Sequence, residues 1–195
     1  MTSGIKLRYL ALLLALTCPL AAPAATPPAP VPTPPAHATD AFLAQLAGRW
    51  DLPGTLGGKP VHYHGEARWV LQDTWLQLNL IDAGAAPGYE ASVYLGFDAK
   101  AGDYVAHWLD KFGAPGARVV GTGRLEGQTF VLLFPYAEGA FRDTFKLATD
   151  GNSGSLLMET QGKDGSWSTF ASYRLSRLPG TAQKPRAQGE QPLTR

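Results

Sequence analysis

The chain has 195 residues, and its 17 Lys and Arg against 16 Asp and Glu give a formal net charge of +1. A nearly neutral balance without a basic stripe argues against nucleic acid as a partner. The single cysteine excludes a framework of intramolecular disulfides.

The first 24 residues have the pattern of a secretory signal peptide. Lys6 and Arg8 precede an apolar run from Tyr9 to Leu16, and small residues follow. The run is far shorter than the roughly 20 residues that a membrane-spanning helix needs. Ala22-Pro23-Ala24 offers a cleavage site, so we expect a mature chain that is periplasmic or secreted.

Cys18 lies inside this signal and raises the alternative of an acylated lipoprotein. Lipoprotein signals usually have Gly, Ala or Ser directly before the cysteine, whereas this chain has Thr17. We therefore favour an ordinary signal peptide. The mature protein then has no disulfide, no thiolate metal site and no thiol nucleophile.

Composition divides the rest of the chain into three parts. Residues 25–39 are mainly Pro, Ala and Thr, which predicts an extended linker. Residues 40–178 hold 12 Lys and Arg against 15 Asp and Glu, a net charge of −3, and are long enough for one domain with a sizeable core. Residues 179–195 are polar and contain Pro and Gly, which predicts a disordered tail.

One short helix should open the domain, and a long series of strands should follow. Residues 40–47 suit a helix that Thr39 or Asp40 caps and Gly48 ends. After that, turn residues separate runs rich in β-branched and aromatic residues, which is strand composition. These runs predict ten strands, near residues 49–53, 60–70, 74–82, 89–98, 103–111, 117–125, 128–135, 140–148, 155–161 and 167–177.

Alternation along the strands predicts one buried and one solvated face. In the second strand, Val61, Tyr63, Ala67 and Trp69 alternate with His62, His64, Glu66 and Arg68. In the eighth strand, Phe141, Phe145 and Leu147 alternate with Arg142, Thr144 and Lys146.

The connections are too short for parallel crossovers, so neighbouring strands should pair antiparallel. A meander this long is best stabilised by closure, which predicts an all-β, antiparallel up-and-down β-barrel of about ten strands. An outer-membrane barrel would also alternate, but this chain ends in a charged tail and lacks the terminal aromatic strand of such barrels.

Gly48-Arg49-Trp50, at the start of the first strand, resembles the G-x-W motif of the lipocalin-like (calycin) barrels. In that superfamily the Trp plugs the closed end of the barrel, and a basic residue near the end of the last strand covers its ring. The resemblance implies that Trp50 closes the barrel, with Arg174 or Arg177 as its partner.

Further motifs extend this resemblance along the chain. They are Leu46-Ala47-Gly48-Arg49-Trp50, a segment over 65–71 that leads into Thr74-Trp75-Leu76, Leu95-Gly96-Phe97-Asp98, Tyr104, and Trp108-Leu109-Asp110 with Gly113. Together they resemble the DUF1579 family, a lipocalin-like family with no established biochemical activity. The similarity covers 43–123 and is looser over 124–177, and Gln72-Asp73 departs from the Gly-containing turn of the family. The resemblance implies a fold and supplies no catalytic residues.

Three histidines are candidates for a metal or haem site. His62 and His64 are two apart on one strand, which could pair them as ligands of zinc or iron. They share the predicted solvated face with Glu66 and Arg68, so we interpret them as surface histidines and predict no metal and no cofactor. A haem-binding barrel would use a buried histidine, for which His107 is the only candidate.

The sequence contains neither a G-x-S-x-G elbow nor an H-E-x-x-H motif. Gly121-Thr122-Gly123 lacks the strand-to-helix setting of a phosphate loop, and strand glycines typically mark a bulge or close packing. Asp110 shares a face with Tyr104, Ala106 and Trp108. Inside the barrel it could act as an acid or base, and otherwise it pairs with Arg118 or Arg142 or lies in water.

The aromatic residues on the strands carry the prediction of a ligand site. Barrels of this size are either filled by side chains or hold one small ligand, and an apolar cavity with a few polar anchors is the usual small-molecule site. We predict an exported protein without catalytic activity that binds a small hydrophobic or amphipathic molecule. The predicted ligand contacts are Tyr63, Trp69, Trp75, Tyr104, Trp108, Asp110, Phe130 and Phe145.

Two alternatives remain open from the sequence. One is a small-molecule enzyme on the same barrel that acts through Asp110 or Glu66. The other is a structural or interaction protein of the bacterial envelope, with the Pro-rich linker as its tether.

Overall fold

The computed structural model describes residues 40–180. The predicted signal peptide (1–24), the linker (25–39) and the tail beyond residue 180 lie outside the described residues. The first element, α1 (Ala41–Leu46), has an N-cap, because the Asp40 carboxylate accepts a hydrogen bond from the Leu43 N–H at 2.9 Å. Phe42, Leu43 and Leu46 form its buried face. No helix in the described range is long and apolar enough to cross a membrane.

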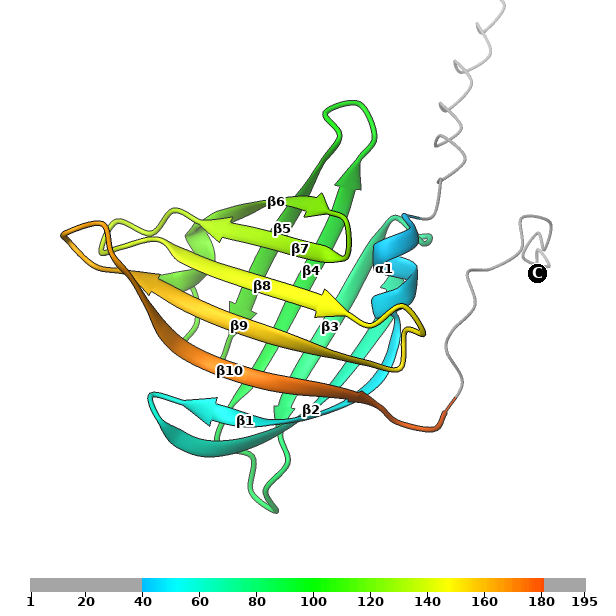
Figure 1. The fold of residues 1–195 in the computed structure, drawn as a ribbon, viewed down its shortest axis with the longest axis horizontal. Helices are drawn as coiled ribbons and strands as arrows, with labels where there is room; N and C mark the ends of the chain where they lie inside the picture. The colour runs from blue at the N-terminus through cyan, green and yellow to red at the C-terminus, as the bar shows by residue number, and fades with distance from the viewer. Residues whose placement is uncertain (1–39, 181–195) are drawn as a thin grey trace, which may run out of the picture. The chain divides into compact units, whose positions relative to one another are not determined.

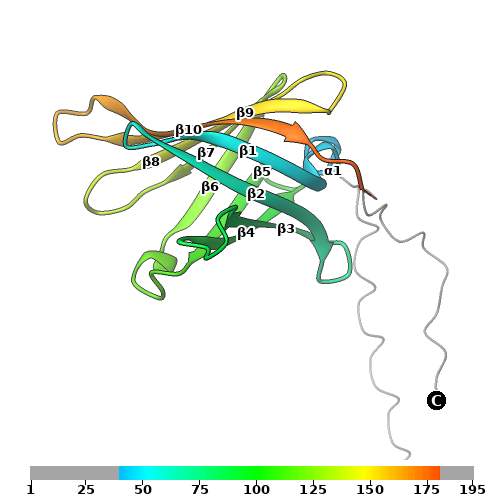
Figure 2. The same cartoon turned by 90° about the horizontal axis from the view of Figure 1, so that it is seen from below.

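Ten strands follow, and each pairs antiparallel with the next. They are β1 (Gly48–Leu56), β2 (Lys59–Val70), β3 (Trp75–Asp82), β4 (Glu90–Asp98), β5 (Asp103–Asp110), β6 (Val120–Glu126), β7 (Thr129–Phe134), β8 (Phe141–Leu147), β9 (Ser153–Gln161) and β10 (Trp167–Arg177). β10 returns to pair with β1, so the sheet closes into a barrel without a free edge. Figures 1 and 2 show the strands wrapped around one axis, with α1 at one end.

The predicted ten-stranded, lipocalin-like up-and-down barrel with one N-terminal helix is therefore confirmed. Two strand boundaries differ from the prediction by three residues, whereas the others agree to within two. β1 runs on through Pro53 to Leu56, although its pairing with β10 is interrupted at Leu52 and Pro53, where the proline has no N–H to donate. Residues 116–118, partly predicted as strand, form a short 3₁₀ helix after Pro115.

Strand alternation places the core inside the barrel. In β2, Tyr63, Ala67 and Trp69 point inward and are buried, whereas the residues between them are mostly exposed. Gly121 of β6 is small for a packing reason, because a Cβ there would lie 2.6 Å from the Phe134 ring. The glycines of the 121–123 segment are therefore explained by close packing, as the sequence indicated.

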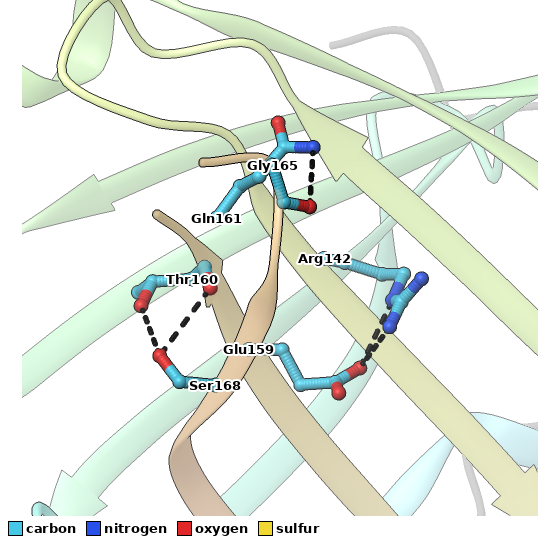
Figure 3. A network of polar contacts seen from close by, with 6 residues as sticks. All are labelled: Arg142, Glu159, Thr160, Gln161, Gly165 and Ser168. Atoms are coloured by element: carbon cyan, nitrogen blue, oxygen red, sulfur yellow. Dashed lines mark hydrogen bonds and ion pairs between the residues drawn. The ribbon is translucent and has the colours of Figure 1, made fainter. Parts of the chain in front are cut away.

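Polar contacts cross the outer wall between neighbouring strands (Figure 3). Arg142 on β8 binds Glu159 on β9 through its Nε and Nη2 atoms, at 2.9 and 2.8 Å from Oε2. The same guanidinium lies 4.2 Å from the ring centroid of Trp167 on β10. Partly exposed pairs of this kind contribute about 1 kcal/mol or less each, so they support the register more than the stability.

Trp50 and Arg177 join the first strand to the last. They are direct partners in the β1–β10 pairing, and the Arg177 guanidinium lies 4.2 Å from the Trp50 ring centroid. Arg177 also donates to the carbonyls of Ala47, Gln45 and Gly151, and the Trp50 indole N–H donates to the Leu46 carbonyl at 2.8 Å. The helix and the closing strand pair thus meet at the buried Trp50 ring and the partly buried Arg177 side chain. Arg174, the other candidate partner, is exposed.

Gly54 of β1 pairs with Tyr173 of β10 and has no room for a side chain, so Gly54→Ala should lower the free energy of unfolding by about 1–3 kcal/mol. A Cβ at this position would lie 2.2 Å from the Ser172 carbonyl oxygen and 2.6 Å from the Tyr173 ring. Urea denaturation followed by tryptophan fluorescence measures the loss. Gly116→Ala is the control, because a Cβ there meets nothing within 4 Å. Equal losses in the two variants would contradict the steric explanation.

Candidate functional site

The barrel interior is hollow at the end opposite α1. The cavity there has a volume of about 610 Å³. Its walls are inward-facing side chains of the strands, and its mouth is formed by the β3–β4, β5–β6 and β7–β8 loops. Nine of the twenty lining residues are aromatic, so the surface offered to a ligand is mainly apolar. A volume of this size lies within the roughly 300–1,000 Å³ range of small-molecule sites.

The other half of the barrel is filled by aromatic side chains. The Phe130 ring centroid lies 4.7 Å from that of Phe42 on α1, 4.7 Å from that of Tyr104 and 6.0 Å from that of Phe145. All four side chains are buried. The Tyr104 hydroxyl donates to Asp40 at 2.7 Å, which fixes it to the helix cap. The sequence left open whether the barrel interior is packed or hollow. In the structure, the half next to α1 is packed with side chains and the opposite half is hollow.

Among the described residues, Asp143 is the one charged residue that is buried, with 1% of its surface exposed. It lies in the middle of β8, opposite Leu132 on β7 and Met158 on β9, and lines the cavity. Its Oδ1 atom has no hydrogen-bond partner. Burial raises the pKa of Asp143 to about 7, because an apolar environment disfavours the charged form.

Four tyrosine side chains line the cavity. The Tyr63 ring makes edge contacts with Tyr89 and Tyr173, at centroid distances of 5.8 and 5.7 Å. Burial raises the pKa of Tyr173, and the nearby Asp143 charge raises it further. Burial and then the Asp143 charge likewise raise the pKa of Tyr136. These hydroxyls stay protonated at neutral pH and can donate hydrogen bonds.

Asp110 is held at the mouth by a short chain of hydrogen bonds. The Trp108 indole N–H donates to the Tyr89 hydroxyl at 3.2 Å, and that hydroxyl donates to Asp110 Oδ2 at 3.3 Å. The Phe112 N–H donates to Asp110 Oδ1 at 2.9 Å. This carboxylate therefore accepts hydrogen bonds from a tyrosine and a backbone amide, and Arg142 is bound to Glu159 instead.

The cavity has a one-sided charge distribution. Its lining contains Asp110, Glu138 and Asp143, and no Lys, Arg or His is among the twenty lining residues. Lys111 is close in sequence but its amine donates to the Gly88 carbonyl, and it lies 5.7 Å from the Phe112 ring centroid. The interior is thus apolar with a negative electrostatic bias.

The structure brings three of the eight predicted contact residues together at the cavity, namely Tyr63, Trp108 and Asp110. Tyr104, Phe130 and Phe145 belong to the packed half. Trp69 is buried and its indole nitrogen has no hydrogen-bond partner, and Trp75 covers Gly96. Which of the eight touches a ligand stays a prediction. Asp143 was missed, although its position between Phe141 and Phe145 gives it the parity of the inward face.

The three histidines of the described range lie outside the cavity. His62 and His64 have half-exposed side chains on the outer wall, and their nitrogens lie 2.6 and 3.5 Å from Asp51 Oδ1. The three side chains form a group close enough to share one metal ion, with Asp51 as the member that the sequence did not indicate. His107 Nε2 lies 2.7 Å from the Ala117 carbonyl oxygen, so its ring fastens the β5–β6 loop. Glu66 is exposed on the outer wall, away from the cavity.

The fold and the site define a lipocalin-like β-barrel with an interior cavity that opens at one end. The chain belongs to the DUF1579 family, described as a protein of unknown function, whose model matches residues 35–177. No curated protein matches the chain.

Two solved structures are similar to the barrel. S-type phycobiliprotein lyase CPES from Guillardia theta is 12% identical, with a TM-score of 0.51, over 72% of this chain and 92% of that chain. Rv2717c from M. tuberculosis is 17% identical, with a TM-score of 0.49, over 70% of this chain and 95% of that chain. At these identities the similarity concerns the fold.

Proposed function

We propose that the protein binds one small hydrophobic or amphipathic molecule in the hollow half of its barrel. The observation that carries the proposal is the cavity of about 610 Å³ with its aromatic wall and few polar groups. Burial of an apolar ligand surface there would supply about 25 cal/mol per Å² removed from water. The filled half supplies the rigidity, because its packed rings and helix hold the strands that carry the cavity wall.

Blocking the cavity should abolish binding while the fold persists. Met158 points inward from β9 and lines the cavity, so Met158→Trp should weaken the binding of a fluorescent fatty-acid analogue at least about tenfold. Leu157→Trp places the same side chain on the opposite face of the same strand and is the matched control. Fluorescence titration measures affinity, and native mass spectrometry of the purified protein detects a co-purified ligand. Equal binding by both variants would refute an interior site.

Acid–base catalysis is a second candidate, because a cavity carboxyl with a pKa of about 7 is suited to proton transfer at neutral pH. Asp143 and Asp110 would be the participating groups, since both line the cavity. The two functions differ in what happens to the bound molecule. A binding protein returns a co-purified ligand with unchanged mass, whereas an enzyme converts it and Asp143→Asn stops the conversion.

The location of the protein outside the cytoplasm is part of the same proposal. The charged start, apolar run and Ala22-Pro23-Ala24 support export of the barrel to the periplasm or the medium. Intact-mass measurement of the protein recovered from the producing cells tests this, since removal of residues 1–24 leaves a chain that begins at Ala25. A chain that retains its first 24 residues would contradict export by cleavage.

A further inference from the structure

Asp143 has no evident role in holding the barrel together. Its main-chain pairing with β7 and β9 would be the same with a leucine at this position, and its neighbours on the inward face of β8 are Phe141 and Phe145. A buried carboxylate normally has a charged or hydrogen-bonding partner, because the interior cannot replace its hydration. Oδ1 of Asp143 has none within the described chain. Asp143 lines the cavity although Oδ1 itself is covered, so a partner from outside the protein would reach this oxygen as the neighbouring side chains shift.

The lining determines which partner is complementary. Asp110 and Glu138 are acidic as well, and the lining contains no basic residue, so an anionic ligand inside the cavity would meet three carboxyl groups, with the Lys111 amine on the Gly88 carbonyl at the mouth as the nearby positive charge. A cation would be attracted by all three. The aromatic rings add to this preference, because the faces of tyrosine and tryptophan rings attract organic cations.

We propose that the ligand is an amphipathic amine whose protonated nitrogen donates a hydrogen bond to Asp143 and whose hydrocarbon part lies against the aromatic wall of the cavity. This inference rests on the proposed binding function and names its ligand class. Met158 beside Asp143, together with Leu156, Phe134 and Phe141, offers the apolar surface for the hydrocarbon part.

The amine should bind more tightly as the pH rises through about 7, because Asp143 must lose its proton to accept the charge-assisted hydrogen bond. The groups that face Asp143 are Tyr136 from the β7–β8 loop and Tyr173 from β10, with Asp110 and Glu138 nearer the mouth. The tyrosines stay protonated throughout this range, since burial raises both of their pKa values. Of Asp143 and these two tyrosines, only Asp143 therefore changes charge between about pH 5.5 and 8.

Three probes with the same decyl chain test the proposal by calorimetry: decylamine, decanol and decanoate. At about pH 8 the wild-type protein should bind decylamine at least about tenfold more tightly than decanoate, with decanol between them. Asp143→Asn should weaken decylamine at least about tenfold and leave decanol within about twofold. Glu66→Gln removes a charge of the same sign from the outer wall, away from the cavity, and should leave the affinity for decylamine within about twofold.

The outcomes separate the inference from the function on which it rests. Equal affinity for decylamine and decanoate, or undiminished decylamine binding by Asp143→Asn, would overturn the amine proposal while leaving the cavity as a ligand site. Failure of all three probes to bind would instead count against the proposed function. Asp143→Asn removes a destabilising charge, so loss of binding by this variant cannot be attributed to unfolding, and circular dichroism verifies its fold.

Discussion

At about pH 8, Asp143→Asn should raise the free energy of unfolding by up to about 4 kcal/mol. Burial holds the pKa of Asp143 at about 7 in the folded chain, against a value near 3.8 for an ordinary aspartate. Each pKa unit corresponds to about 1.4 kcal/mol between the two protonation states. Asparagine has nearly the same shape and carries no charge, so the substitution removes the cost of burying an unpaired carboxylate.

The stability difference between the two chains should depend on pH, and its direction follows from the raised pKa of Asp143. Between about pH 4 and 7 the folded chain holds the Asp143 proton that the unfolded chain has lost, so the contribution of Asp143 lowers stability as the pH rises. The cost is complete above about pH 7 and absent below about pH 4. Urea denaturation of both chains at a series of pH values should therefore give a difference that grows across this interval and then stays constant.

Other carboxylates do not disturb the comparison. The Gly84 and Gly88 amides lower the pKa of Asp82, and the Ser166 hydroxyl and amide lower that of Asp164, so both add stability that is lost as the pH falls. They are present in both chains and cancel in the difference. Glu66→Gln removes an exposed carboxylate from the outer wall. Its free energy of unfolding should stay within about 0.5 kcal/mol of the wild-type value at every pH. An Asp143→Asn variant that is less stable at about pH 8 would show that the carboxylate has a stabilising partner.

The fold could be predicted closely because its signals are local. Turn residues mark where each strand ends, and the alternation in β2 already identifies Tyr63, Ala67 and Trp69 as the inward face. Short connections then leave antiparallel pairing, and a ten-stranded meander avoids free edges by closing. The two largest boundary errors arose where proline changes local geometry, at Pro53 and Pro115.

The site was less accessible from the sequence, because depth along the barrel axis is a property of the closed sheet. Phe145 and Asp143 are two residues apart on one face of β8, yet Phe145 packs in the filled half while Asp143 lines the hollow half. Alternation along a strand predicts which face of the sheet a residue occupies, but it does not predict how far along the barrel axis the residue lies. Asp143 itself could have been found from its parity, since a carboxylate on an otherwise apolar strand face is unusual.

Trp50→Ala should lower the free energy of unfolding by about 3–5 kcal/mol, a large part of the stability of a domain of this size. The Trp50 side chain is 1% exposed, and its removal leaves a void between α1, β1 and β10. It also removes the ring under the Arg177 guanidinium, which already donates to three main-chain carbonyls around the helix end and the β8–β9 turn. Chemical denaturation measures the loss, and the affinity of the folded fraction for a cavity ligand should be unchanged because Trp50 does not line the cavity.

The barrel offers its own control for the ring-to-guanidinium contact. Arg142 lies 4.2 Å from the Trp167 ring centroid on the outer wall, the same distance as Arg177 from Trp50 in the closed end. Double-mutant cycles with Trp→Leu and Arg→Met at each pair should give a coupling of about 2 kcal/mol at Trp50, whose ring is buried, and about 0.5 kcal/mol at Trp167, whose ring is partly exposed, because water weakens the attraction at the surface. Equal couplings would mean that burial adds nothing to the contact. A Trp50 variant that stays stable but loses ligand would place this residue in the site and not in the closure of the barrel.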